Sequence, residues 1–115
     1  MKRLLVACLL LATLISPFAA QSAPARQILH QHRIWVTGYL PTGNRTYDGS
    51  WPYYGTGGSD LRTIPLHTMV TIRGLGRIWI NDTGSSVRPY QVDMFVYSLS
   101  RAYAITGYYQ ASWWS

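Results

Sequence analysis

Alternation of apolar and polar positions predicts a series of short β-strands. The segments are rich in β-branched and aromatic residues and are bounded by Gly, Pro, Asn or Asp. Gly74-Leu75-Gly76 separates two of them and predicts a hairpin. The expected strands are residues 33–40, 68–73, 77–81, 91–97 and 108–114. Several strands of this length predict a small, mostly β protein built as a barrel.

Two other segments depart from the strand pattern. Ser98 is placed to cap a short helix that runs to Ile105, with Gly107 just beyond its end. The stretch Thr42–Gly58 has no hydrophobic period and is rich in Gly, Pro, Asn and Tyr, which predicts a long surface loop. Loops of this length in small domains are usually functional or disordered.

The N-terminus has the three parts of a secretory signal peptide. Lys2 and Arg3 supply positive charge, an apolar run follows, and a small-residue segment comes after it. Cleavage after Ser22 or Ala25 fits this pattern. We therefore expect residues 1–25 to be removed and the protein to be exported to the periplasm or cell envelope, or secreted.

A membrane anchor and a lipid on Cys8 are the alternatives for this segment. An anchor needs about 20 apolar residues, and Ser16-Pro17 interrupts the run sooner. The residues before Cys8 resemble a lipobox, but the apolar run is short before the cysteine and continues past it. We expect no stable membrane insertion after cleavage. What remains is a flexible leader, 26–33, and one domain, 34–115, which is expected to be a monomer without disulfides.

Charge narrows the class of partner. Beyond residue 25 the chain has no lysine and no glutamate, and its eight arginines and four aspartates leave a charge of about +4. An anionic partner fits this balance. For an exported protein an acidic cell-wall or lipid surface is favoured, and nucleic acid is not expected. The alternative is that the arginines only keep the domain soluble.

Trp and Tyr, rather than Phe, dominate the aromatic residues. Such rings suit sugar binding, because one face stacks on a ligand while the polar tip donates a hydrogen bond, although they also fill strand faces. His30, His32 and His67 lack metal-ligand spacing, so neither a metal nor a cofactor is expected. There is no Ser/His/Asp elbow, which leaves the aspartates as candidate catalytic groups.

Asp93 is the anomalous carboxylate. It lies inside an apolar strand, and alternation puts it on one face with Gln91 and Phe95. Phe95 suggests partial desolvation, which would raise the carboxyl pKa toward use as a general acid. The alternative is ordinary alternation, with Asp93 facing solvent.

Asp82 opens the string Asp-Thr-Gly-Ser-Ser over residues 82–86, which matches pepsin-like aspartic proteases. Two such aspartates must share a proton across two lobes or two subunits. Only 33 residues follow Asp82, too few for a flap and a second half of the core. We therefore reject this interpretation.

Four segments taken together give a better match. The chain resembles the three-aspartate ("3D") domain family, whose pattern runs Val-Thr-Ala-Tyr, Asp-Pro-x-x-Ile-Pro-Leu-Gly-Thr, Asp-Thr-Gly-Gly and Ile-Asp-x-Phe. The corresponding segments here are residues 36–39, 60–68, 82–84 and 92–95. The resemblance covers residues 34 to about 112. It implies a small six-stranded double-psi β-barrel with one short helix.

The resemblance also implies a reaction. The family includes the catalytic part of membrane-bound lytic transglycosylase A and stationary-phase secreted muralytic proteins. These enzymes cleave the bond between N-acetylmuramic acid and N-acetylglucosamine and leave a 1,6-anhydro product. By the family pattern Asp93 is the single general acid/base, and Asp82 and Asp60 shape the site. Implied contacts to the peptidoglycan glycan are Tyr39, Thr83, Gly84 and Arg88, the last for lactyl or peptide-stem carboxylates.

Three departures from the family pattern leave the function open. Leu61 replaces a proline, His67 replaces a glycine, and residues 85–89 replace a Gly-Ala-Ile-Lys-Gly stretch. The alternative function is therefore a non-catalytic glycan-binding barrel resembling rare lipoprotein A or expansins. In that case the protein would need its aromatic rings, rather than Asp93, to bind the glycan.

Overall fold

The computed structural model describes residues 26–115. The expected signal peptide, its cleavage sites after Ser22 or Ala25, and Cys8 all lie outside the described residues. No helix within residues 26–115 has the length and apolar character needed to cross a membrane.

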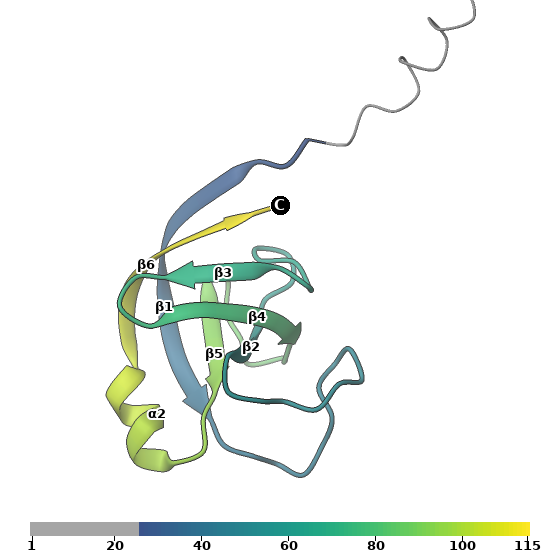
Figure 1. The fold of residues 1–115 in the computed structure, drawn as a ribbon, viewed down its shortest axis with the longest axis vertical. Coiled ribbons are helices and arrows are strands. Elements are labelled where there is room, and N and C mark those ends of the chain that lie inside the picture. The colour runs from purple at the N-terminus through teal and green to yellow at the C-terminus, as the bar shows by residue number, and fades with distance from the viewer. Residues whose placement is uncertain (1–25) are drawn as a thin grey trace, which may run out of the picture.

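The described chain forms six strands and one short helix that close into a barrel (Figure 1). The strands are adjacent in the order β1-β5-β2-β4-β3-β6. The pairs β1–β5 and β2–β4 are parallel, and the other pairs are antiparallel. The elements are β1 (Leu29–Tyr39), β2 (Thr56–Ser59), β3 (Met69–Ile72), β4 (Gly76–Asp82), β5 (Gln91–Phe95), α2 (Leu99–Ile105) and β6 (Gly107–Trp114). This confirms the mostly β barrel with one short helix, and the mixed topology is consistent with a double-psi barrel.

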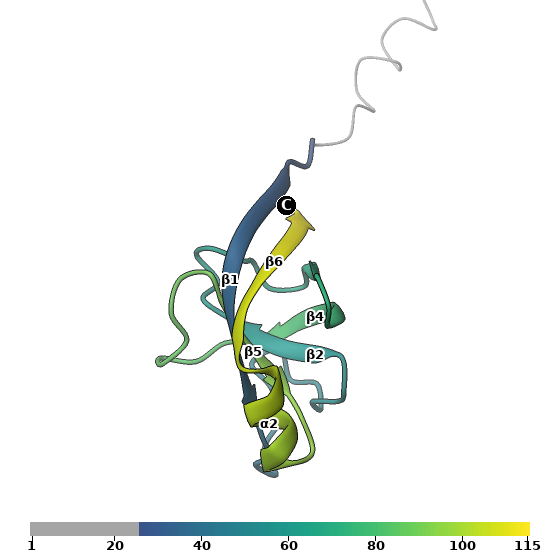
Figure 2. The same cartoon turned by 90° about the vertical axis from the view of Figure 1, so that its left-hand side faces the viewer.

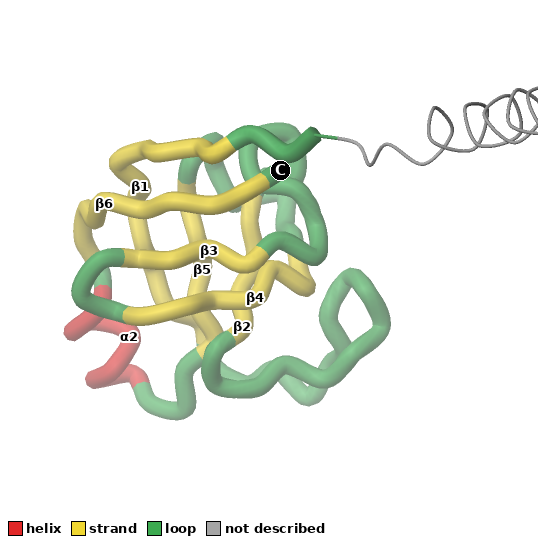
Figure 3. The backbone as a smooth tube through the Cα atoms, turned by 45° about the horizontal axis from the view of Figure 1, so that its top comes forward, coloured by secondary structure: helices red, strands yellow, loops and turns green. Residues whose placement is uncertain are grey.

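The predicted alternation explains the core. Every second residue of a strand faces the barrel interior, and the tube drawing shows the strands crossing around that interior (Figure 3). The strand residues of the hydrophobic core cluster are Ile34, Val36, Val70, Ile72, Ile78, Ile80, Val92, Met94, Ala111 and Trp113. Closure pairs the strand edges of a domain without disulfides, so that no long edge is left exposed.

The short helix lies where the sequence predicts it. Ser98 caps α2, and its hydroxyl accepts a hydrogen bond from the Arg101 backbone N–H over 3.1 Å. The helix packs at one end of the barrel (Figure 2). There it contacts β1 so closely that a Cβ at Gly38 would lie 2.8 Å from the Ala102 Cα. A glycine on the strand therefore sets the distance between helix and barrel.

Strand β1 begins at Leu29, so residues 29–33, expected in a flexible leader, are strand. They pair with the end of β6, from Leu29 opposite Trp114 to Arg33 opposite Gln110, and the two strands run side by side (Figure 2). His30 and His32 stack on Trp113, with ring centroids 5.5 and 5.6 Å apart. The stacking and the ladder order a segment whose polar sequence hides the strand pattern.

The expected loop Thr42–Gly58 is also shorter than predicted, because its end forms the buried strand β2. Glycine has low strand propensity, which conceals this strand in the sequence. Its role lies in close packing: a Cβ at Gly57 would lie 2.8 Å from the Asp93 carbonyl oxygen. The remaining loop, residues 40–55, leaves the barrel on one side (Figure 1).

Candidate active site

The barrel brings Asp82 and Asp93 to either side of Gly58. Strand β2 lies between β4 and β5, and Gly58 is opposite Asp82 on one side and Asp93 on the other. Residues directly opposite each other in a sheet project to the same face. Because Gly58 has no side chain, nothing from β2 separates the two carboxylates.

Asp93 is half-buried and has one side-chain hydrogen bond. The Thr37 hydroxyl donates to Asp93 Oδ1 over 2.9 Å, and Gln91 Nε2 donates to the Thr37 oxygen over 3.0 Å. Burial raises the pKa of the Asp93 carboxyl above its ordinary value; the Thr37 hydrogen bond opposes this rise, and the nearby charge of Asp82 adds to it. Asp93 therefore holds its proton to higher pH than a solvated aspartate.

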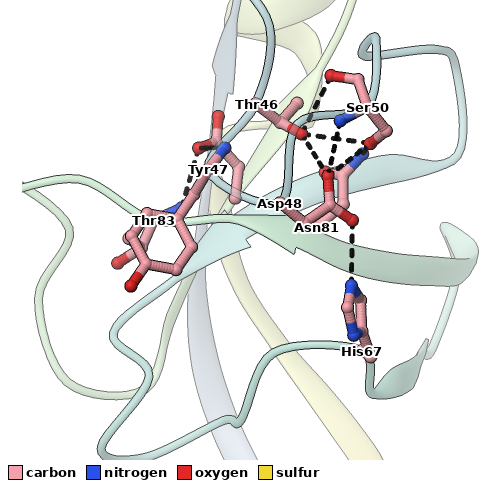
Figure 4. Close-up of polar contacts among 8 residues, drawn as sticks. Thr46, Tyr47, Asp48, Ser50, His67, Asn81 and Thr83 are labelled. Atoms are coloured by element: carbon pink, nitrogen blue, oxygen red, sulfur yellow. Dashed lines mark hydrogen bonds and ion pairs between the residues drawn. The ribbon is translucent and has the colours of Figure 1, made fainter.

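Asp82 is fixed by backbone donors. Its Oδ1 accepts hydrogen bonds from the Tyr47 N–H over 3.0 Å and from the Thr83 N–H over 2.9 Å. One donor belongs to the loop after β1 and the other to the turn after β4, as the dashed lines from Tyr47 and Thr83 show (Figure 4). The carboxylate thus ties the loop to the site and lies near enough to Asp93 for its charge to influence that group.

Tyr39 is the third polar side chain of the site, beside Asp82 and Asp93. Its ring packs edge-on against Phe95 with centroids 5.5 Å apart. Its hydroxyl is buried, and its nearest acceptor is the Asp82 carboxylate, toward which it makes at most a weak hydrogen bond of poor geometry. Burial raises the pKa of the phenol, and the charges of Asp82 and Asp93 raise it further. Tyr39 is therefore a neutral donor beside two carboxyl groups.

These groups line an open cavity of about 200 Å³. It is bounded by the end of β1, the loop after β1 and the turn after β4. Of the residues predicted for the site, five lie together here: Tyr39, Asp82, Thr83, Gly84 and Asp93. Arg45, Pro52, Ser86 and Val87 are among the residues that complete the lining.

Asp60 and Arg88 are not part of this cavity. Asp60 is buried at the end of β2, where it accepts two hydrogen bonds from the Arg62 guanidinium, at 3.0 and 2.8 Å, and one from the Arg62 N–H. The Arg62 side-chain hydrogen bonds are the largest influence lowering the pKa of the Asp60 carboxyl. Asp60 thus stabilises a turn, and Arg88 lines a second, larger cavity.

The sequence did not point to a network around Asp48 (Figure 4). Asp48 Oδ1 accepts from the Thr46 hydroxyl over 2.7 Å and from the Ser50 N–H over 2.9 Å. Its Oδ2 lies 2.9 Å from His67 Nε2. These contacts, led by Ser50, hold the pKa of Asp48 well below its usual range. The spacing Thr-x-Asp-x-Ser is the sequence signal that could have predicted this network, because such residues close local turns.

His67 stands in a left-handed backbone conformation, with φ of 60°. This region favours glycine. Its ring stacks on Trp79 with centroids 5.6 Å apart. The Asp48–His67 pair fastens the loop after β1 to the segment before β3. The bond from the Asp48 N–H to the Asn81 carbonyl, 3.2 Å long, fastens the same loop to strand β4.

No group of three or more His, Cys, Asp or Glu side chains within residues 26–115 lies close enough together to hold a metal ion. The polar side chains that line the cavity carry carboxyl, hydroxyl, amide and guanidinium groups. Asp93 can donate and accept a proton beside the Asp82 carboxyl group.

Comparison with known protein families gives no matching family model, and comparison with curated proteins gives no matching relative.

Proposed function

We propose that this protein is a peptidoglycan lytic transglycosylase that cleaves the β-1,4 bond between N-acetylmuramic acid and N-acetylglucosamine. The observation that carries the proposal is the half-buried Asp93 carboxyl, whose raised pKa arises beside Asp82 in a cavity open to solvent. A carboxyl group that holds its proton to higher pH than a solvated aspartate suits general acid catalysis.

One carboxyl group suffices for the reaction. Asp93 protonates the glycosidic oxygen as the bond from that oxygen to the muramyl anomeric carbon breaks. The muramyl 6-hydroxyl attacks the same carbon and gives its proton to the Asp93 carboxylate. The products are a 1,6-anhydro sugar and a free 4-hydroxyl, and Asp93 ends in its starting state. A pair of carboxylates, as in most glycosidases, is not required.

Asp82 and Tyr39 have supporting roles in this proposal. Asp82 keeps its carboxylate oriented through two backbone donors, and its charge favours positive charge developing at the anomeric carbon. The Tyr39 hydroxyl makes no well-formed hydrogen bond among residues 26–115 and lies near Asp82, so it can turn to donate to a sugar oxygen. These roles need no metal or cofactor.

Two observations support assigning the chain to the three-aspartate family and its double-psi barrel. The closed barrel has six strands with two parallel pairs among the described residues. His67, which replaces the glycine of the family pattern, has the positive φ that glycine adopts freely. The backbone at residue 67 would therefore accept the glycine of the family pattern without strain.

The loop after β1 offers a sugar-binding surface. Trp51 is exposed and lies under the Arg45 guanidinium at 4.6 Å, and Tyr47 is exposed beside it in sequence. Because the Asp48–His67 pair fixes this loop, the rings are held in place before a ligand binds. Such preorganisation lowers the cost of ordering on binding.

The test is to incubate the chain from residue 26 onward with purified peptidoglycan and to analyse the released fragments by mass spectrometry. We expect 1,6-anhydro muropeptides, and a loss of about 10²- to 10⁴-fold in Asp93→Asn. Asp60→Asn is the matched control, because it replaces a carboxylate outside the cavity and should still release product. Loss in Asp60→Asn with retention in Asp93→Asn would contradict the assignment.

The exposed rings of the loop also favour a second candidate, a non-catalytic peptidoglycan-binding barrel. Trp51, Tyr53 and Tyr54 are each more than half exposed. In this case the wild-type protein would sediment with peptidoglycan and release nothing. Trp51→Ala would then weaken sedimentation, whereas Asp93→Asn would leave it unchanged.

A further inference from the structure

The larger cavity of the described chain, about 530 Å³, lies outside the proposed catalytic pocket. Its size is typical of ligand sites. Strand β1, the loop before β5 and strand β6 form its walls. The lining residues that matter here are Arg33, Trp35, Arg88, Tyr90, Gln91 and Tyr108.

This cavity combines cations with aromatic rings and lacks carboxylates. The ion pairs among residues 26–115 are Arg62–Asp60 and His67–Asp48, so neither Arg33 nor Arg88 is paired. Arg33 lies over the Tyr108 ring at 4.2 Å, and the Tyr108 ring is 4.8 Å from that of Trp35. Unpaired guanidinium groups on an aromatic wall suit an anionic ligand with apolar parts.

A hydrogen-bond chain joins this cavity to Asp93. The Gln91 side chain accepts from the Arg88 N–H over 2.9 Å and donates to the Thr37 oxygen over 3.0 Å. Thr37 in turn donates to Asp93 Oδ1. Ser86 lines both cavities. A ligand with one part at Asp93 can therefore extend into the larger cavity without crossing the barrel.

We propose that the larger cavity binds the peptide stem of the muramyl residue, with Arg33 and Arg88 contacting stem carboxylates and the rings covering its apolar groups. The inference rests on the proposed function for the identity of the glycan. A neutral sugar could accept hydrogen bonds from the two arginines but would leave their charges unpaired, whereas a stem supplies carboxylates at a distance from the sugar. Bidentate pairing of Arg with carboxylate would give the site its selectivity.

The experiment measures binding without cleavage, in an Asp93→Asn background. The probes are a muramyl tetrasaccharide with peptide stems, the same fragment freed of peptide so that lactyl carboxylates remain, and neutral chitotetraose. Affinities are compared by calorimetry at low salt. We expect the stem-bearing fragment to bind about fivefold more tightly than the peptide-free one, a size suited to partly exposed charge pairs.

Two double variants test the arginines. Adding Arg33→Gln and Arg88→Gln should abolish the preference. Adding Arg73→Gln and Arg77→Gln removes the same charge from exposed positions outside this cavity and should preserve it. Circular dichroism confirms that each variant is folded.

Several outcomes would overturn the stem assignment. Equal affinity for the stem-bearing and peptide-free fragments would do so, as would equal loss in both double variants, which would indicate only general charge attraction. Tighter binding of the peptide-free fragment through Arg33 and Arg88 would assign the site to the lactyl carboxylate instead. If the stem-bearing fragment binds more tightly but the wild type releases no anhydro products, only the proposed reaction is wrong. If the wild type cleaves peptidoglycan but the two fragments bind equally well, only the stem site is wrong.

Discussion

Thr37 and Asp93 face each other across the parallel pair β1–β5, and the Thr37 hydroxyl donates to Asp93 Oδ1 over 2.9 Å. The same hydroxyl oxygen accepts a hydrogen bond from Gln91, which directs the Thr37 proton toward Asp93. This bond stabilises the charged carboxylate, whereas burial and Asp82 disfavour it. The pKa of Asp93 is therefore a balance that single substitutions can move in either direction.

Thr37→Val should raise the pKa of Asp93. The variant loses the only influence that lowers the pKa of Asp93, so the descending limb of the pH–rate profile should shift to higher pH. Peptidoglycan cleavage followed from pH 3 to 9 measures the shift. Thr71→Val is the control, because Thr71 is exposed on β3; an identical profile in both variants would contradict a positioning role for Thr37.

Asp93→Asn should stabilise the fold at neutral pH while it abolishes cleavage. With a pKa raised above 3.8, folded Asp93 binds more protons than the unfolded chain just above that pH, so stability falls as pH rises through the folded pKa. Solvent screening reduces this loss because the carboxyl is only half-buried, and asparagine avoids the loss altogether.

Thermal unfolding of wild type and Asp93→Asn from pH 3 to 7 checks this sign. The difference in melting temperature should be largest at pH 7 and should vanish near pH 3, where aspartate is protonated in both states. Asparagine can still accept the Thr37 hydrogen bond, so the comparison isolates the charge. A destabilised Asp93→Asn at pH 7 would show that the carboxylate is a structural group.

The sequence predicts the strands in which apolar and polar residues alternate. It does not predict the strands that are held by close backbone packing or ring stacking without such alternation. Residues 77–81 and 91–97 carry a clear apolar period, and β4 and β5 lie within one or two residues of the prediction. Strand β2 was missed because Gly57 and Gly58 have no side chain to show a pattern. The start of β1 was missed because His30 and His32 are polar, although stacking on Trp113 orders them.

In the candidate site too, the sequence predicts the residues that a motif marks and misses those that depend on packing. Asp82 and Asp93 stand at strand ends or in strands, so their motifs place them, and the barrel register brings them together. Asp60 has an equally good motif, but its neighbour Arg62 holds it in a turn. Arg33 could not be assigned from sequence, because the Tyr108 ring that it covers lies on a distant strand. The local turn around Asp48 left a signal in the sequence, but its contact with His67 did not, because His67 is 19 residues away.

Asp82→Asn should lower the pKa of Asp93 without releasing the loop. Asparagine Oδ1 can still accept from the Tyr47 and Thr83 N–H groups, but the negative charge that raises the pKa of Asp93 is lost. Cleavage at neutral pH should fall on the order of tenfold, part of what acid–base catalysis supplies. The descending limb of the pH profile should move to lower pH; movement in the opposite direction would exclude this coupling.

His67→Gly and His67→Ala should differ although both lose Asp48 as a partner. The backbone at residue 67 has φ of 60°, which glycine adopts without strain and alanine does not. His67→Gly should therefore be more stable than His67→Ala by about 1 kcal/mol. Urea unfolding of the two variants measures the difference; equal midpoints would show that the turn relaxes when His67 is removed.

Gly57→Ala should damage both the fold and the site, because a Cβ there would lie 2.8 Å from the Asp93 carbonyl oxygen. Backbone must move to relieve such a contact, at a cost of about 1–3 kcal/mol. The displaced segment is β5 at Asp93, so cleavage per folded molecule should also fall. Gly107→Ala is the matched control, since its Cβ would meet only the Tyr109 ring at 3.8 Å. That variant should be as stable as the wild type, and equal effects of the two changes would show that Gly57 does not limit the approach of β2 to β5.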